Sequence, residues 1–363
     1  MLVAWDSRCP PSSNAMSHLT LPSIFDSIVA NPANEFVERA AADGRQAIGV
    51  TCSFVPEPLI AVDGLVPIRV RAGGVIGTPL ADTYLSSVVC PYVRSLLESV
   101  LDGLQGHLAG WVLAASCDHL RRLADNLDYL ARPGFLHVLD VPHKSDALAV
   151  DFFTNELQAL AERLNRKFGV NTGPDALRRS IARHNEHLAL VRTLVELRWR
   201  DRPALTGAAF HRVMVACATA PKDLLRQPLE RLCEQLADES GIEPPRARLL
   251  LVASQVDDPD YLRLIESQGA VIVADRFCLG ALPLSEPIPT TAEPLQALAE
   301  YYLRNTSCPR MMDEVAGRAA DIIRWAERSR ADGIVIATMK FCDLWGVCLL
   351  YTSDAADDNR VVG

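Results

Sequence analysis

The sequence lacks a CxxC pair, a long apolar run and an excess of positive charge. Without CxxC pairs, zinc-ribbon and thioredoxin-type sites have no support. No apolar stretch approaches the roughly 20 residues of a membrane span, and residues 1–16 lack the basic start and long apolar core of a signal peptide. The net charge of −9 opposes nucleic-acid binding, which normally requires a basic face. These absences predict a cytoplasmic protein that binds neither nucleic acid nor membranes.

What the sequence does contain is ordinary globular composition with many cysteines. Its 363 residues are 49% hydrophobic and 22% charged, which is enough apolar mass for two or three packed units. In a reducing compartment, cysteines are more often buried, metal-binding or catalytic than disulfide-bonded. A free cysteine usually packs as a small hydrophobic side chain, so each one needs further support before it is given a function. The ten are Cys9, Cys52, Cys90, Cys117, Cys217, Cys233, Cys278, Cys308, Cys342 and Cys348.

Strand and helix patterns alternate in two parts of the chain, which is typical of parallel sheets covered by helices on both faces. Between these parts the strand pattern disappears and long amphipathic helices are expected. The sequence therefore predicts an α/β protein with two Rossmann-like parallel-sheet units and a helical insert between them. The expected strands are 47–54, 66–71, 110–116, 135–141, 249–254, 270–275 and 334–339. The expected divisions are a helical lead at 1–45, a first α/β unit at 46–145, the insert at 146–244, a second α/β unit at 245–347 and a tail at 348–363.

Three cysteines stand where parallel sheets bind ligands, beyond the carboxyl ends of strands. Cys117 directly follows a predicted strand and starts a helix, and Cys342 follows the last predicted strand. Cys90 precedes a helix whose first residue, Pro91, suits a first helical turn. Unpaired amides and the positive dipole end at a helix start favour thiolates. Cys90 and Cys117 are expected to share one edge, and Cys342 can join them only if the two units face each other. Three thiolates that converge in one cleft would form a soft metal site, suited to an iron–sulfur cluster or a zinc ion.

Five segments, in this order, resemble the 2-hydroxyacyl-CoA dehydratase family, in the D-component type that also includes benzoyl-CoA reductase subunits. They are TCSFVPEPLIAVDGLVPIRV at 51–70, CPYVRSLLE at 90–98, ASCDHLRRL at 115–123, VPHK at 141–144 and MKFCD at 339–343. The resemblance covers about residues 46–347, and the segments at 90–98, 115–123 and 339–343 are its specific parts. In that family three cysteines of a subunit hold a [4Fe–4S] cluster with one iron open. Residue by residue, the resemblance implies Cys90, Cys117 and Cys342 as the metal ligands.

The resemblance implies a lyase that removes water from a (R)-2-hydroxyacyl-CoA under anaerobic conditions. The thioester does not acidify the β-position, so the family uses one electron, delivered by an ATP-driven iron–sulfur activator. The thioester becomes a ketyl radical, hydroxide leaves from the α-carbon, the β-proton becomes acidic enough to remove, and the electron is recovered. An iron with a free site can act as a Lewis acid on the departing hydroxyl. The implied partners are the acyl-CoA substrate, a related second dehydratase subunit in a heterodimer, and the activator protein.

Three further residues are candidates for the site. Glu57 follows the first strand and is a candidate catalytic group, against the alternative of a helix-start carboxylate that faces water. His143 and Lys144 follow the strand at 135–141, where an acyl-CoA phosphate or thioester could pass. The alternative for this pair is a solvated loop.

Other side chains are left outside the predicted metal site. Cys52, Cys278 and Cys308 are alternative ligands, because the first two lie at strand ends. The segment HNEH at 184–187 has the spacing of a metal pair, but it lies on a helix rich in charge. It is therefore expected to be a solvated helix face.

The end of the chain departs from the family pattern. The family usually has proline after KFCD, whereas Leu344 follows Asp343 here. The family then continues through another strand and a closing helix, while this chain runs VCLLYTSDAADDNRVVG. Because CLLYTSDAADD resembles the translation of a transposon-end sequencing adapter, residues from about 348 onward are expected to be non-native and the second unit truncated. The strand at 334–339 would then border an unpaired edge or an uncovered apolar face.

Two alternatives to the dehydratase remain open. The first is a benzoyl-CoA reductase-type subunit that reduces an aromatic thioester, because no motif marks the acyl pocket. The second, from a different class, is a non-catalytic electron-transfer partner that only carries the cluster.

Overall fold

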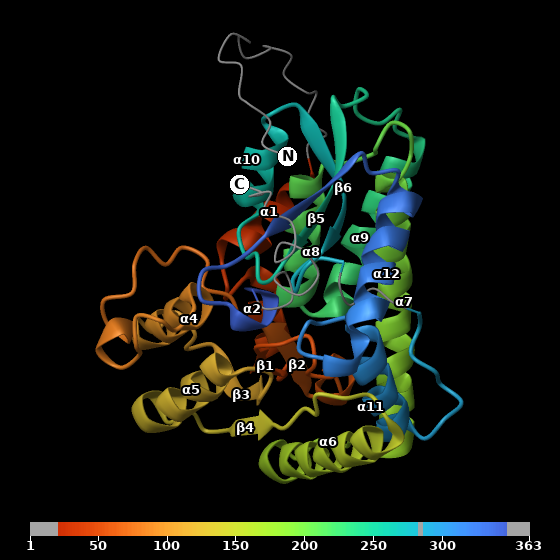
Figure 1. Cartoon of the computed structure of the whole chain (residues 1–363). Coiled ribbons are helices and arrows are strands. Elements are labelled where there is room, and N and C mark those ends of the chain that lie inside the picture. Colours follow the sequence, from red (N-terminus) through yellow and green to blue (C-terminus); the bar gives the residue numbers. More distant parts are fainter. Residues whose placement is uncertain (1–20, 282–285, 347–363) are drawn as a thin grey trace.

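A computed structural model describes residues 21–281 and 286–346 of the protein. It contains two parallel sheets with helices packed around them (Figure 1). The α/β fold class expected from the sequence is therefore confirmed. The predicted tail at 348–363, together with Cys9 and Cys348, lies outside the described residues.

The first sheet is built from short strands rich in β-branched and apolar residues, all paired in parallel. Their order is β2-β1-β3-β4, with β1 (Gln46–Val50), β2 (Leu65–Arg69), β3 (Leu108–Ala114) and β4 (Leu136–Leu139). Alternate residues of β3 pack into different cores, because successive side chains of a strand point to opposite faces. The strand predicted at 47–54 ends earlier, at Val50, since the chain turns there and Phe54 enters the core.

Helices cover both faces of this sheet. On one face lie α4 (Pro91–Leu101) and α5 (Asp118–Asn126), which continues into a π-helical turn, η2 (Leu127–Ala131). The opposite face packs against helices from the insert and from the second half of the chain. The other elements of this region are α1 (Ser23–Ala30), α2 (Glu35–Ala42), α3 (Glu57–Ile60) and a 3-10 turn, η1 (Ala81–Thr83).

The insert is helical, as the loss of the strand pattern predicted. It consists of α6 (Ala147–Phe168), α7 (Pro174–Arg198), α8 (Gly207–Thr219) and α9 (Lys222–Asp238). The first of these begins at Asp146, whose side chain accepts a hydrogen bond from the Ala149 amide at 2.9 Å. It ends at Gly169, whose φ of +68° is a conformation that favours glycine.

The second sheet has three parallel strands in the order β6-β5-β7. They are β5 (Ala247–Ala253), β6 (Ala270–Arg276) and β7 (Gly333–Ala337), and the helices of this half are α10 (Pro259–Glu266), α11 (Pro294–Asn305), η3 (Met312–Glu314) and α12 (Val315–Ser329). Within the described part of the chain, β7 pairs with β5 and forms an edge. Ile334 and Ile336 on this edge are 45% and 51% exposed. That this exposure comes from a truncated second unit stays a prediction.

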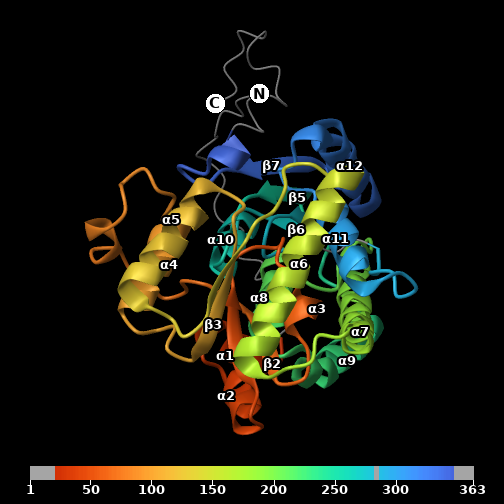
Figure 2. The ribbon, with the colours of Figure 1, turned by 90° about the horizontal axis from the view of Figure 1, so that it is seen from below.

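The two sheets lie one above the other in Figure 1, and the long helix α7 runs along both. One apolar core joins β1, β3 and β4 to α6, α7 and α11, so elements from both halves of the chain and from the insert share it. Seen from below, α6 crosses the molecule beside α11 (Figure 2), in agreement with their direct contact. No helix in the ranges 21–281 and 286–346 is both long and apolar enough to cross a membrane.

Candidate functional site

Each sheet has a point where the strand order reverses. The chain places β2 and β3 on opposite sides of β1, and β6 and β7 on opposite sides of β5. The crevice beyond the carboxyl ends of the strands at such a point is where open parallel sheets bind ligands. Cys117 lies just beyond β3, and Cys342 lies a few residues beyond β7. Each cysteine therefore stands at the reversal point of its own sheet.

The three family cysteines share one local position, immediately before a helix. Cys90 is the N-cap residue of α4, and Cys117 is the N-cap residue of α5. Cys342 precedes residues 343–346, which are helical. Each sulfur lies beside a backbone amide of the first turn that follows it, and this amide lowers the pKa of the thiol. These amides belong to Val93, Leu120 and Trp345.

Burial nevertheless dominates the acidity of these thiols. It raises the pKa of Cys90 to about 11 and that of Cys117 to about 12, and it also raises the pKa of Cys342. The Ser254 side chain, just beyond β5, opposes this shift at Cys342 by hydrogen bonding to its sulfur. The three thiols are therefore protonated at neutral pH, and a metal would displace those protons on binding.

The two units face each other at this position. Met339 and Phe341, which follow β7, pack against the apolar core formed by β3, α4 and α5 of the first unit. The charge of Cys342 contributes to the raised pKa of both Cys90 and Cys117, so the three sulfurs are electrostatic neighbours. That Cys342 joins Cys90 and Cys117 across the two units stays a prediction.

The backbone just before Cys342 is strained. Phe341 has a φ of +63°, in the left-handed region that a bulky residue occupies at a cost of roughly 1–2 kcal/mol. Its ring packs against the first unit and lies 5.0 Å from the Lys340 ammonium. Strain of this kind clusters at functional sites, because the surrounding contacts must enforce it. Here those contacts hold Cys342 toward the first unit.

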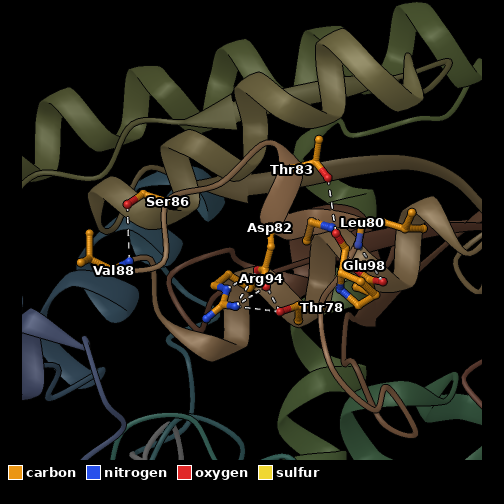
Figure 3. A network of polar contacts seen from close by, with 10 residues as sticks. Thr78, Leu80, Asp82, Thr83, Ser86, Val88, Arg94 and Glu98 are labelled. Atoms are coloured by element: carbon orange, nitrogen blue, oxygen red, sulfur yellow. Dashed lines mark hydrogen bonds and ion pairs between the residues drawn. The ribbon is translucent and has the colours of Figure 1, made fainter.

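A polar network holds the loop that leads to Cys90 (Figure 3). The Glu98 carboxylate on α4 accepts hydrogen bonds from the amides of Leu80 and Ala81, at 3.2 and 2.7 Å. Arg94 donates to both carboxylate oxygens of Asp82 at 2.7 Å. Hydrogen bonding to Arg94 lowers the pKa of Asp82. The helix that Cys90 caps is thus tied to the loop before it.

Cys90, Cys117 and Cys342 offer thiolates, which are the ligands that iron–sulfur clusters use. Among residues 21–281 and 286–346, no group of three or more Cys, His, Asp or Glu side chains is spaced to hold one metal ion. A [4Fe–4S] cluster spreads its thiolate ligands over several irons, so they need not meet at one point. Cys90, Cys117 and Cys342 are free thiols beside helix-start amides, which are the hydrogen bonds that tune such clusters.

The alternative cysteines lie close to the same place. Burial raises the pKa of Cys278 well above its ordinary value, and Cys308, Cys52 and Cys342 contribute to this shift. The structure therefore gathers these thiols beside Cys342, which the sequence alone did not indicate. Cys217 and Cys233 belong to the apolar core of the helical insert, and Cys217 also lines the cavity described next.

A cavity of about 90 Å³ is lined by Cys278 among these thiols. Arg69, Glu57 and Lys222 line it as well. The remaining lining side chains are mostly apolar or aromatic and include Val55, Val191, Met214, Tyr301 and Tyr302. Since its residues come from the first unit, the insert and the second unit, no local pattern in the sequence could have indicated it.

Glu57 is not the water-facing carboxylate of the alternative interpretation. It begins α3, its side chain is 26% exposed, and it forms an ion pair with Lys222 at the start of α9. The Lys222 ammonium is also 3.1 Å from Nδ1 of His184. Glu57 thus lines the cavity together with Lys222 and His184. It is not among the groups that shift the pKa of the three family cysteines.

The prediction that HNEH at 184–187 is a solvated face was wrong. His184 is 9% exposed and His187 is 5% exposed, because both lie on the face of α7 that meets α9 and α3. Three residues apart on a helix, they point the same way. Burial lowers the pKa of His187 to about 3 and holds that of His184 well below its usual value.

His143 and Lys144 lie on the surface beyond β4. Nδ1 of His143 is 3.3 Å from the carbonyl oxygen of Arg310, and Lys144 pairs loosely with Asp313 at 3.8 Å. Their contacts are with the 310–313 segment, and neither residue lines the cavity described above. Arg310 itself donates to the carbonyl of Ser116 at 2.8 Å, so it ties this segment to the end of β3.

Comparisons with known proteins show which family and which relatives this chain is similar to. A family model described as 2-hydroxyglutaryl-CoA dehydratase, D-component, matches residues 52–359. The (R)-phenyllactyl-CoA dehydratase beta subunit of Clostridium sporogenes is 24% identical over 88% of this chain and 85% of its own length. A benzoyl-CoA reductase subunit of Thauera aromatica is 23% identical, with 89% of this chain and 85% of its own length covered. The (R)-2-hydroxyglutaryl-CoA dehydratase beta subunit of Acidaminococcus fermentans is 24% identical, with 88% and 86% covered.

Proposed function

Because the chain belongs to the 2-hydroxyglutaryl-CoA dehydratase D-component family, we propose that it is the iron–sulfur subunit of a 2-hydroxyacyl-CoA dehydratase. Such an enzyme removes water from a (R)-2-hydroxyacyl-CoA and works with a related second subunit and an ATP-dependent activator. The proposal is supported by the segment before Cys342, where Met339 and Phe341 pack against the core that contains Cys90 and borders Cys117, and by the helix that follows each of the three cysteines. Two relatives named as beta subunits of dehydratases support the expectation of a partner subunit.

The three thiols would hold the cluster. When bound, a [4Fe–4S] cluster with one open iron supplies single-electron chemistry and a Lewis-acid site. The helix-start amides beside each sulfur would stabilise the thiolates, and the apolar core that includes Phe341 would keep water away from them.

The cavity lined by Cys278 supplies the acid–base groups of the proposal. Elimination releases one β-proton and one hydroxide, which leave together as water, and the single electron is recovered. Glu57 is the carboxylate placed to accept a proton in this cavity, with Lys222 and His184 as its immediate partners. His184 is kept neutral by burial first and by Lys222 second, so its Nδ1 can accept a hydrogen bond from the lysine ammonium.

A second candidate function is reduction of an aromatic thioester. The similarity to a benzoyl-CoA reductase subunit favours it, and that relative matches over as much of the chain as the dehydratase subunits do. The test is turnover of aliphatic 2-hydroxyacyl-CoAs and of benzoyl-CoA by anaerobically purified protein with its second subunit, an activator, ATP and a reductant. Dehydration of the 2-hydroxy substrates is expected. Reduction of benzoyl-CoA alone would overturn the dehydratase proposal, and turnover of neither by cluster-loaded protein would favour an electron-transfer role.

The cluster ligands are tested by iron content. Anaerobically prepared protein is expected to bind about four irons per chain, as a [4Fe–4S] cluster requires. Serine at Cys90, Cys117 or Cys342 should lower the iron content and the visible absorption of the cluster. Serine at Cys217 or Cys233, both buried in the insert, provides the matched control and should leave iron content unchanged. Equal iron loss in both sets of variants would refute the ligand assignment.

A further inference from the structure

The loop between β2 and α4 exposes a row of large apolar side chains. The loop leads directly into Cys90 and lies at the side of the molecule, beside α4 (Figure 1). Ile76 is 98% exposed, and the three other members of the row are between 44% and 57% exposed. They are Leu80, Tyr84 and Val88. A single exposed apolar side chain is ordinary, whereas several in one short segment mark an interaction surface.

The same loop is also apolar on its inner side. Ala81, Leu85 and Val89 are buried in the core that contains Cys90. The residue just before each of these three is one of the exposed apolar residues. A helix that is apolar all round is normally buried, and the same reasoning applies to this compact loop. Its outer side is therefore expected to be covered by another molecule.

The loop carries almost no charge. Residues 72–90 contain one charged residue, Asp82, in a chain that is 22% charged. Arg94 donates to both oxygens of this carboxylate at 2.7 Å, which compensates its charge. Few charges together with exposed aromatic and apolar residues are the composition of the centre of a protein–protein interface. A membrane surface is less favoured, because anionic lipids attract basic segments and residues 72–90 include no lysine or arginine.

A polar network holds the loop in one conformation (Figure 3). Thr78 donates to Asp82 at 2.9 Å, and Arg94 on α4 donates to Thr78 at the same distance. Glu98, also on α4, accepts hydrogen bonds from two amides of the loop. A partner would therefore bind a surface that is already formed, and little free energy would be lost in ordering it.

We propose that residues 76–88 form the centre of the interface with the related second subunit of the dehydratase. The inference rests on the proposed function, which includes such a subunit, and it adds where that subunit binds. Two relatives are named as beta subunits, and permanent partners bury more apolar surface than transient ones do. A stable interface buries about 800 Å² on each partner, so the loop supplies the apolar centre and neighbouring surfaces supply the rim.

Two substitutions in the exposed row test the interface. Leu80→Asp and Tyr84→Asp each place a charge in the row and leave the buried side of the loop intact. The dissociation constant for the purified second dehydratase chain of the same source should rise roughly 30-fold or more, the size of a hot-spot loss. Unchanged binding of both variants would overturn the proposal.

The matched control is Leu264→Asp on α10. Leu264 is 66% exposed and has the charged residues Asp260 and Arg263 on the same short helix. It is therefore an isolated apolar residue on a charged surface, and the control should bind the second subunit as the wild type does. Weakening of the control as strong as that of the loop variants would overturn the proposal.

Melting of the isolated chain separates an interface from a structural role. Leu80 and Tyr84 are about half exposed, so both aspartate variants should melt within about 2 °C of the wild type. Leu85→Asp places a charge in the core and should melt at a clearly lower temperature. A fall in the loop variants as large as that of Leu85→Asp would make the outer row structural and overturn the proposal.

Three other outcomes would assign the loop to a different partner and overturn the proposal. The first is a dimer of this chain in solution that Tyr84→Asp separates. The second is binding of the wild-type chain to vesicles of phosphatidylcholine and phosphatidylglycerol that the variant loses. The third is unchanged affinity of Tyr84→Asp for the second subunit together with a raised KM for the activator protein.

Binding and melting need no turnover, so they separate this inference from the proposed function. A pair of chains that binds through the loop but does not dehydrate would overturn only the proposed function. Tight binding that the loop variants leave unchanged would overturn only the interface. Lack of binding between the wild-type chain and the second subunit would count against both.

Discussion

Replacing Arg198 by methionine should destabilise the protein strongly, because it breaks a fully buried ion pair. Arg198 ends α7 in the insert, and Asp275 lies in β6; their side chains are 0% and 1% exposed and meet at 2.7 Å. The arginine also donates to the Ile272 carbonyl at 2.9 Å and stacks over the Phe210 ring at 4.0 Å. Methionine retains much of the apolar packing but leaves the carboxylate with the Ala281 amide, at 2.6 Å. Breaking a buried pair on one side typically costs about 3–5 kcal/mol.

The assay is urea unfolding of the wild type, Arg198→Met and the double variant Arg198→Met/Asp275→Asn. The single variant should lose about 3–5 kcal/mol of unfolding free energy. The double variant should recover much of that loss, since asparagine removes the unpaired charge and keeps an oxygen for the Ala281 amide. A loss under about 1 kcal/mol in the single variant, or no recovery in the double one, would refute the reasoning.

Two other predictions follow from the same region and from the buried histidines. Gly280→Ala should destabilise the protein by about 1–3 kcal/mol, because its Cβ would lie 2.1 Å from a carboxylate oxygen of Asp275 and 2.8 Å from the Phe277 ring; an unchanged urea midpoint would show that the loop yields freely. Stability should also fall on acidification. The folded-state pKa of His187 is lowered to about 3 and that of His211 to about 4, mainly by burial, against about 6.5 in the unfolded chain. The unfolded state therefore binds more protons below pH 6.5. Each histidine lowers the free energy of unfolding by about 2 kcal/mol between pH 7 and pH 5. Buried carboxylates change the stability in the opposite direction on acidification, so the test compares the unfolding free energy of the wild type and of His211→Gln as a function of pH. Identical slopes of the two curves would contradict the prediction.

Much of the fold could be predicted from local pattern. The apolar runs at 110–116 and 270–275 indicated strands, because a buried parallel strand needs near-continuous apolar residues. The loss of this pattern after residue 146 indicated the helical insert, and Asp146 and Gly169 mark the ends of its first helix. Strand ends were less accurate. The strand at 47–54 stops at Val50, because the residues that follow enter the core through a turn.

The sequence by itself determined that Cys90 and Cys117 precede helices and that Cys342 follows a strand, since these are properties of neighbouring residues. Together with the family motifs, they were enough to single out three of the ten cysteines. Only the tertiary structure decided what surrounds them. The burial of His184 and His187 and the pairing of Glu57 with Lys222 each depend on groups far apart in the chain. A charged side chain looks the same in a sequence whether water, a carboxylate or a cavity lies beside it, and its energetic role depends on which of these the fold brings there.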